Sequence, residues 1–287
     1  MKVGIVGGAG RVGSTVCYTL VLLRLADEIY LLDTDAERAK GEAMDVLHTL
    51  SAVESDAEVR GGSDYGALEG CELVIVTAGA PRKPGMSRLE LRGINRDIVR
   101  EIAAKTAEHA PDSMLFIVTN PVDVLTYHAW QASGFPPERV FGLGTYLDTI
   151  RLRSMLRKEL GIAYGEEAYI FGEHGDSMFP VFRLSESYPR ERLMQVYREV
   201  RTSAMEVISR KGGTWFAPAL AIAKVVETLS HGGRCTLSTY IEEHGLYLGY
   251  LAELSRRGVR QAEFELTQEE AEALQRSAQV VGRAIEE

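Results

Sequence analysis

His174 lies in the stretch "FGEHGDS", between two glycines and directly after an apolar, strand-like run. Asp148 and Arg151 lie three residues apart in "LDTIRLR", a spacing that puts both side chains on one face of a helix. A histidine that exchanges a proton with an alcohol needs a carboxylate on its other ring nitrogen, and Asp148 is a candidate for it. The alternative is a plain surface ion pair between Asp148 and Arg151, and spacing alone leaves both open.

A second set of residues has the spacing of a dinucleotide site. "GGAGRVG" places Gly8, Gly10 and Gly13 between a strand-like run and a helix-like run, and Asp33 ends the next strand-like run. Such glycines let the backbone approach a pyrophosphate at a helix N-terminus, and the acid accepts hydrogen bonds from a ribose diol. Because Asp33 would repel a 2′-phosphate, the pattern favours NAD over NADP. The alternative is a tight turn in an α/β protein without a cofactor.

Residues 80–92, "APRKPGMSRLELR", concentrate positive charge in a chain whose formal net charge is -9. They contain Arg82, Lys83, Arg88 and Arg92, beside prolines and a glycine that prevent regular structure at first. The segment is either a solvated surface loop or a loop that closes over an anion. Asn120 in "VTNP" ends a strand-like run, where ligands bind in open α/β sheets, although Asn-Pro is also typical of a turn.

The elements that must position these residues alternate in the first half of the chain. Short apolar runs at 2–7, 28–33, 72–79 and 113–120 alternate with helical patterns at 11–26, 35–50 and 87–110. This order predicts βαβ units around a parallel sheet that is buried on both faces. The second half predicts helices at 146–160, 191–213 and 267–287, and strands at 166–176 and 235–254 with a turn at Gly245. We therefore predict an α/β fold, a Rossmann-type doubly wound sheet over residues 1–143 and an α+β substrate domain over 144–287.

Composition excludes several classes of function. The excess of Asp and Glu argues against a nucleic-acid partner, and no apolar run is long enough to cross a bilayer, so no membrane partner is expected. Cys17, Cys71 and Cys235 lie far apart, which predicts neither a metal site nor a disulfide framework. A reducing compartment, the cytoplasm, is the expected location.

The motifs together resemble the lactate/malate dehydrogenase family. The glycine turn, Asp33, "TAGAPRKPGMSR", "VTNP", "LDTIRLR" and "GEHGDS" occur in the family's order, over residues 1 to about 230. "PRKPGMSR" looks like the malate branch, and "KGGTWFAP" resembles the lactate-dehydrogenase-like malate dehydrogenases. The second half looks shorter than is usual in the family.

The resemblance implies a role for each matched residue. His174 is the proton acceptor in malate oxidation and Asp148 orients it, while Arg151 holds the substrate carboxylate and Arg88 polarises the carbonyl. Arg82 takes the position that separates the two substrate classes, and Asn120 and Thr214 lie beside the substrate. The implied NAD contacts come from the glycine turn, from the ends of three strand-like runs and from one helical run. They are Gly8, Gly10, Arg11, Val12, Gly13, Asp33, Thr77, Gly79, Asn95, Val118 and Asn120.

The resemblance further implies a reversible NAD-dependent oxidation of (S)-malate to oxaloacetate, with a small dicarboxylic 2-hydroxy or 2-oxo acid as the partner. An L-lactate or broad 2-hydroxyacid dehydrogenase is the nearest alternative, and a non-catalytic NAD-binding module is the alternative of another class. No metal is expected. A homo-oligomer, either a tetramer or a dimer, is expected from the family.

Overall fold

The computed structural model describes residues 1–80 and 88–287, and its centre is one nine-stranded sheet. The strand order is β11-β10-β9-β6-β5-β4-β1-β2-β3. The strands of this sheet are β1 (Lys2–Val6), β2 (Glu28–Leu32), β3 (Glu58–Gly62), β4 (Leu73–Val76), β5 (Met114–Ile117), β6 (Val140–Gly142), β9 (Gly233–Ile241), β10 (Leu246–Ser255) and β11 (Gly258–Gln261). A separate antiparallel ribbon pairs β7 (Glu167–Phe171) with β8 (Phe179–Arg183).

The first six strands are parallel and doubly wound. From β1 the chain adds β2 and β3 on one side, then crosses to add β4, β5 and β6 on the other. The order therefore reverses between β1 and β4, and their carboxyl ends open a crevice. Strands β9, β10 and β11 continue the sheet antiparallel beyond β6, joined through the pair Gly142 and Ser238. The predicted Rossmann-type fold class is confirmed.

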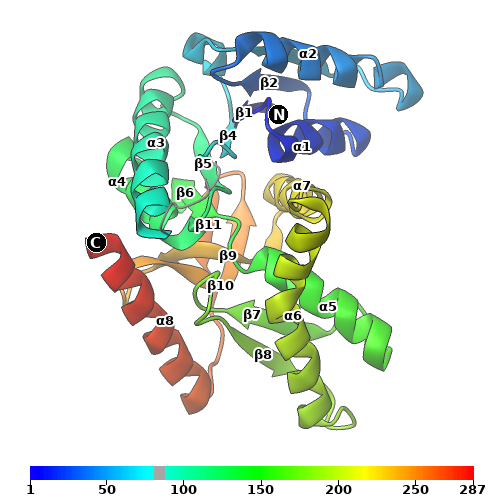
Figure 1. Cartoon of the computed structure of the whole chain (residues 1–287), viewed down its shortest axis with the longest axis vertical. Coiled ribbons are helices and arrows are strands. Elements are labelled where there is room, and N and C mark those ends of the chain that lie inside the picture. The colour runs from blue at the N-terminus through cyan, green and yellow to red at the C-terminus, as the bar shows by residue number, and fades with distance from the viewer. Residues whose placement is uncertain (81–87) are drawn as a thin grey trace.

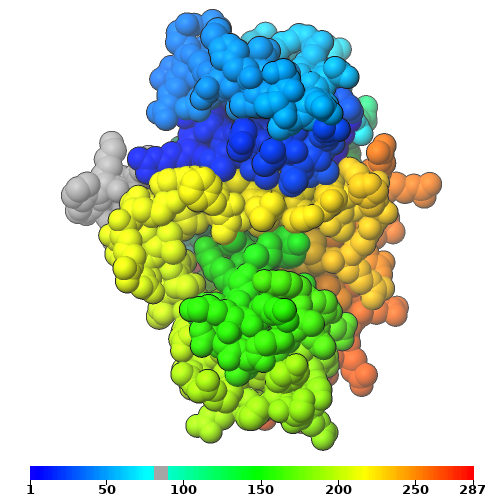
Figure 2. Space-filling view, turned by 90° about the vertical axis from the view of Figure 1, so that its right-hand side faces the viewer, coloured from blue at the N-terminus to red at the C-terminus, as the bar shows by residue number. Residues whose placement is uncertain are grey.

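Helices from both halves of the chain cover the sheet (Figure 1). The helices of the described residues are α1 (Arg11–Leu22), α2 (Ala36–Leu47), α3 (Arg88–His109), α4 (Val122–Ser133), α5 (Tyr146–Leu160), α6 (Arg190–Lys211), α7 (Phe216–His231) and α8 (Gln268–Glu286). Helices α3 and α4 cover one face, while α1 and α7 share the other. Figure 2 shows α7 and the end of α6, in yellow, directly against the blue N-terminal residues.

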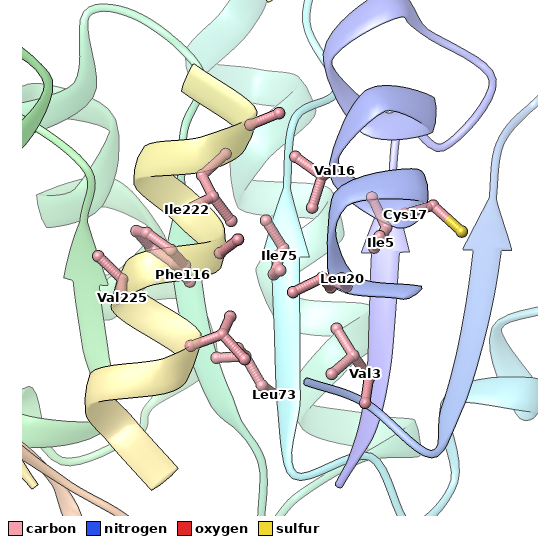
Figure 3. Packing of buried hydrophobic residues seen from close by; sticks show 14 of the residues in the cluster. Val3, Ile5, Val16, Cys17, Leu20, Leu73, Ile75, Phe116, Ile222 and Val225 are labelled. Carbon is pink, nitrogen blue, oxygen red and sulfur yellow. The ribbon is translucent and has the colours of Figure 1, made fainter. Parts of the chain in front are cut away.

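The packing of α7 joins the two halves into one core (Figure 3). Ile222 and Val225 of α7 lie over Ile75 and Phe116 of the parallel sheet, in the same buried cluster as Leu20 of α1. Removing one such side chain to alanine costs about 2–5 kcal/mol of stability. The sequence pattern predicts no element at 216–231, because a run this apolar has no helical periodicity that distinguishes it from a buried strand.

Candidate functional site

The glycine turn joins β1 to α1 at the reversal point of the sheet. A Cβ atom on Gly13 would lie 2.5 Å from the carbonyl oxygen of Gly7, and one on Gly8 would lie 2.8 Å from Cα of Leu31. The protein's own packing therefore requires both of these glycines. A Cβ on Gly10 would meet only the Gly7 oxygen, at 3.1 Å, so the space beside Gly10 is open.

Backbone N–H groups at this turn are directed beyond the helix. The amide of Ser14 is bonded to the carbonyl of Gly10 at 2.9 Å, so the amides of residues 11–13 belong to the first turn, which has no intrahelical acceptor. Asp33 directly follows β2, and one of its carboxylate oxygens accepts the N–H of Ala9 at 3.0 Å. The open space, the amides and the carboxylate fit a pyrophosphate with its adjoining ribose.

The ends of β4 and β5 bring the other predicted NAD contacts together. The Thr77 hydroxyl donates to the carbonyl of Val6 at 3.1 Å. The buried amide of Asn95 accepts the N–H of Ala80 at 2.7 Å and donates to the carbonyl of Asn120 at 3.1 Å. A Cβ on Gly79 would lie 2.6 Å from the Thr119 side chain. Asn95 thus connects the two strand ends that border the crevice.

The histidine site is a short chain of charged hydrogen bonds. Nδ1 of His174 lies 2.5 Å from one carboxylate oxygen of Asp148, and the other oxygen accepts Nη1 of Arg151 at 3.0 Å. Asp148 and Arg151 share one face of α5, and the Asp148 side chain is 5% exposed. The alternative of a surface ion pair is therefore wrong, because the aspartate is buried and bonded to both partners.

Burial and charge oppose each other in this group. Burial raises the pKa of Asp148, but the charges and hydrogen bonds of His174 and Arg151 outweigh burial, so its pKa is lowered below the usual value. Burial lowers the pKa of His174. The charge and hydrogen bond of Asp148, together with the charge of Asp123, outweigh burial, so the pKa of His174 is raised above 6.5. A buried carboxylate thus favours the protonated imidazole.

Asp123 is a member of the site that sequence reasoning missed. It lies in the first turn of α4, fully inside the protein, and accepts the backbone N–H of His174 at 2.7 Å and the hydroxyl of Ser238 at 2.6 Å. Burial raises its pKa to about 6, although these two hydrogen bonds act in the opposite direction. An acid directly after Asn-Pro-Val was the available signal, and it indicates only a favourable helix N-terminus.

A cavity of about 780 Å³ joins the two sides of the site. Its wall includes Val12, Val118 and Asn120 on the cofactor side, and Asp148, Arg151 and His174 on the other. Thr214 also lines it, and its buried hydroxyl has no hydrogen-bond partner in the part of the chain that the structure describes. A buried polar atom without a protein partner indicates a ligand position.

The structure describes little of the two arginines predicted to bind substrate from residues 80–92. Arg82 lies outside the described residues, and Arg88 is described only as the first residue of α3. A further contact joins the two halves of the chain: the guanidinium of Arg11 lies 5.0 Å from the ring centre of Trp215, next to Thr214. The first residue of α1 is thereby connected to the segment that leads into α7.

Residues 1–80 and 88–287 contain no grouping of His, Cys, Asp and Glu side chains able to hold a metal ion. The same residues form no helix with the length and apolar character that a membrane crossing needs. Cys17, Cys71 and Cys235 are buried free thiols.

Known proteins resemble the chain in both halves. Residues 1–142 match the family model of the lactate/malate dehydrogenase NAD-binding domain, and residues 145–287 match that of the family's alpha/beta C-terminal domain. The chain therefore belongs to the lactate/malate dehydrogenase family, whose members are NAD-dependent oxidoreductases, and the expected cofactor NAD agrees with the match.

Individual relatives carry both names of the family. A malate dehydrogenase of Archaeoglobus fulgidus is 41% identical over 100% of this chain and 99% of its own length. An L-lactate dehydrogenase of Fervidobacterium nodosum is 36% identical over 100% and 98%. A solved structure of the Archaeoglobus enzyme in complex with NADH has a TM-score of 0.92, at 40% identity and with 100% and 99% covered. The chain therefore spans nearly the whole length of this relative.

Proposed function

We propose that the chain is an NAD-dependent malate dehydrogenase that interconverts (S)-malate and oxaloacetate. The observation that carries the proposal is the buried hydrogen-bonded group of His174, Asp148 and Arg151 beside a dinucleotide turn. Malate over lactate is supported by Arg82 in the cationic segment and by the Archaeoglobus relative. The domain division at residues 143 and 144, and the location in the cytoplasm, belong to the same proposal.

The proton is handled by His174. Because Asp148 accepts the hydrogen on Nδ1, the other ring nitrogen, Nε2, is the atom that takes the hydroxyl proton of the alcohol. Asp148 then stabilises the resulting imidazolium without leaving its place. NAD, when bound, supplies the hydride acceptor. In the reverse direction the protonated His174 returns its proton to the carbonyl oxygen.

Arginine side chains bind and orient the acid. One guanidinium nitrogen of Arg151 is held by Asp148, which directs the remaining N–H groups into the cavity, where a carboxylate accepts two parallel hydrogen bonds. Arg88 polarises the carbonyl, and Arg82 pairs the second carboxylate of the dicarboxylate. Thr214 and Asn120 border the substrate. The proposed NAD contacts remain those at the glycine turn and the three strand ends.

A second candidate function is an L-lactate dehydrogenase, which the Fervidobacterium relative favours. The two functions differ at Arg82. A lactate-type substrate has no second carboxylate for this arginine, and a desolvated guanidinium without a partner costs roughly 3–5 kcal/mol, or on the order of a hundredfold to a few thousandfold in preference.

NADH absorbance with oxaloacetate and pyruvate separates these functions. We expect oxaloacetate to be preferred by the wild type, and Arg82→Gln to lose most of that preference. Lys83→Gln removes the same charge one residue away and is the matched control, with less than a twofold change. Preference of the wild type for pyruvate would make the lactate function correct. NADH binding without turnover of either acid would favour the non-catalytic module.

We also propose a homo-oligomer. Large apolar side chains are exposed on α1 and on the two helices that border it, α2 and α7: Tyr18, Leu22, Met44, Leu47, Phe216 and Leu220. Apolar surface gathered in this way is typical of a covered face. Analytical ultracentrifugation measures the mass, and a monomer at micromolar concentration would contradict the proposal.

A further inference from the structure

Two arginines of α6 face the cavity of the proposed active site. Arg198 and Arg201 are three residues apart, and both line the same cavity as Arg151 and His174. Arg201 also reaches the loop that carries the histidine, where its Nη2 donates to the carbonyl oxygen of Asp176 at 3.1 Å. The pair therefore lies along the wall that an incoming ligand passes.

Neither guanidinium is neutralised. Among the described residues, no carboxylate oxygen lies within 4.0 Å of Arg198 or Arg201. Elsewhere on α6, Arg210 is paired with Glu206 at 2.7 Å. This wall of the cavity therefore carries two uncompensated positive charges in a chain whose formal net charge is -9.

The whole cavity carries an excess of positive charge. Among the described residues, its ionisable lining consists of three arginines, two aspartates and one histidine: Asp148, Arg151, His174, Asp176, Arg198 and Arg201. Asp148 is bonded to Arg151 and His174, and Asp176 has no ion-pair partner within the described part of the chain. With neutral His174 the formal charges sum to one positive charge, which attracts anions.

We propose that Arg198 and Arg201 form an entrance subsite for small carboxylate anions, which concentrates the substrate at the cavity before Arg151 and His174 bind it. The subsite deepens the proposed function and rests on it, since it commits to a dicarboxylate dianion as the preferred ligand. Charges that line a cleft with low-dielectric walls raise the local concentration and the association rate of an oppositely charged ligand.

The charge of the ligand determines the size of the effect. Because electrostatic work is proportional to that charge, the factor lost by a dianion is about the square of the factor lost by a monoanion. For charges roughly 10 Å apart in water, removing both arginines costs on the order of tenfold for a dianion and threefold for a monoanion at low salt. Salt removes the effect, because the screening length falls from about 30 Å at 0.01 M to about 3 Å at 1 M.

The test is the salt dependence of kcat/KM. The variants are Arg198→Gln/Arg201→Gln and, as the matched control, Arg192→Gln/Arg210→Gln, which removes two charges from the same helix outside the cavity wall. Each is measured with oxaloacetate and with pyruvate at about 0.01 M and about 1 M ionic strength. We expect the cavity variant to lose kcat/KM about tenfold with oxaloacetate and threefold with pyruvate at low salt only, with kcat unchanged. The control should lose less than twofold.

A second variant separates charge from loop support. Arg201→Lys keeps the charge but not the geometry of the bond to Asp176, so it should retain nearly full kcat/KM at low salt. If kcat falls in Arg198→Gln/Arg201→Gln and is equally low in Arg201→Lys, the subsite is overturned and Arg201 is assigned to positioning of the loop. Equal low-salt losses in the cavity and control variants, or none in either, would overturn it as well. If the wild type prefers pyruvate, only the malate function is contradicted. The subsite is then tested by the low-salt loss of kcat/KM with pyruvate in the cavity variant.

Discussion

The two sides of the cavity are built in opposite ways. On the cofactor side, one continuous stretch, residues 7–13, presents backbone amides and open space, with Asp33 beside it and the ends of β4 and β5 along the crevice. On the histidine side, side chains converge from α4, α5, β9 and the loop between β7 and β8. The difference teaches that a backbone site is encoded locally, while a side-chain site depends on the whole fold.

The largest expected effect tests the histidine side. His174→Gln removes the proposed proton acceptor, so kcat should fall by roughly 10²- to 10⁴-fold. The Kd for NADH, measured by fluorescence titration, should stay within about twofold, because the cofactor side does not depend on this side chain. Equal losses in kcat and NADH affinity would show that the two sides are not separate.

The pH profile of the wild type provides the control for this assignment. Because the pKa of His174 is raised above 6.5, the imidazolium persists to higher pH than in an ordinary histidine. In the proposed mechanism, oxaloacetate reduction needs the protonated form of His174, so its rate should fall as pH rises through that pKa. Malate oxidation needs the neutral form and should rise over the same range. A reduction rate that increases with pH would assign the proton to another group.

A smaller effect is expected at Asp123, which holds the histidine through its backbone. Asp123→Ala leaves the His174 N–H and the Ser238 hydroxyl without this acceptor, at about 1–3 kcal/mol for each buried group. Freedom of the loop should lower kcat/KM about tenfold to a hundredfold. Urea unfolding and steady-state rates measure both. Ser238→Ala removes one contact only and should cost less on both measures.

The sign of the pH effect at Asp123 is opposite to that of an ordinary ion pair. Its pKa is raised to about 6 in the folded chain, so its protonated form is favoured by folding. The stability that this group contributes is fully present below about pH 4 and is lost as pH rises through about 6. Asp123→Asn does not titrate, so wild type should be more stable relative to this variant at pH 4 than at pH 7. The reverse trend would contradict the raised pKa.

What the sequence could predict follows the same division. The glycine turn and the C-terminal helix were predictable because their signals are contiguous, and Asp33 because it follows the turn at the usual spacing. Thr267 and Glu270 form a capping box at the start of that helix. The pairing of His174 with Asp148 was predictable only as a candidate, through the spacing of Asp148 and Arg151 and the family resemblance. The bond between Asp123 and His174 spans 51 residues, and no local pattern encodes it.

The helix and the strands that the sequence did not predict lack a regular alternation of apolar and polar residues. Helix α7 is apolar on most of its surface because it is enclosed by α1, the sheet and α5, so its residues do not alternate with polar ones. Strand β6 has three residues and β3 ends in two glycines, which is too little pattern to indicate a strand. These elements are stabilised by packing against neighbouring elements, and short-range sequence patterns do not contain that information.

The smallest expected effect distinguishes two glycines on the cofactor side. In Gly13→Ala the new methyl group meets backbone 2.5 Å away, so stability should fall by about 1–3 kcal/mol. In Gly10→Ala it meets one oxygen at 3.1 Å and otherwise occupies the open space, so stability should fall by less than about 1 kcal/mol while NADH binding weakens about tenfold. Thermal unfolding with and without NADH measures both. If Gly10→Ala bound NADH like the wild type, the open space beside the turn would not be where the pyrophosphate lies.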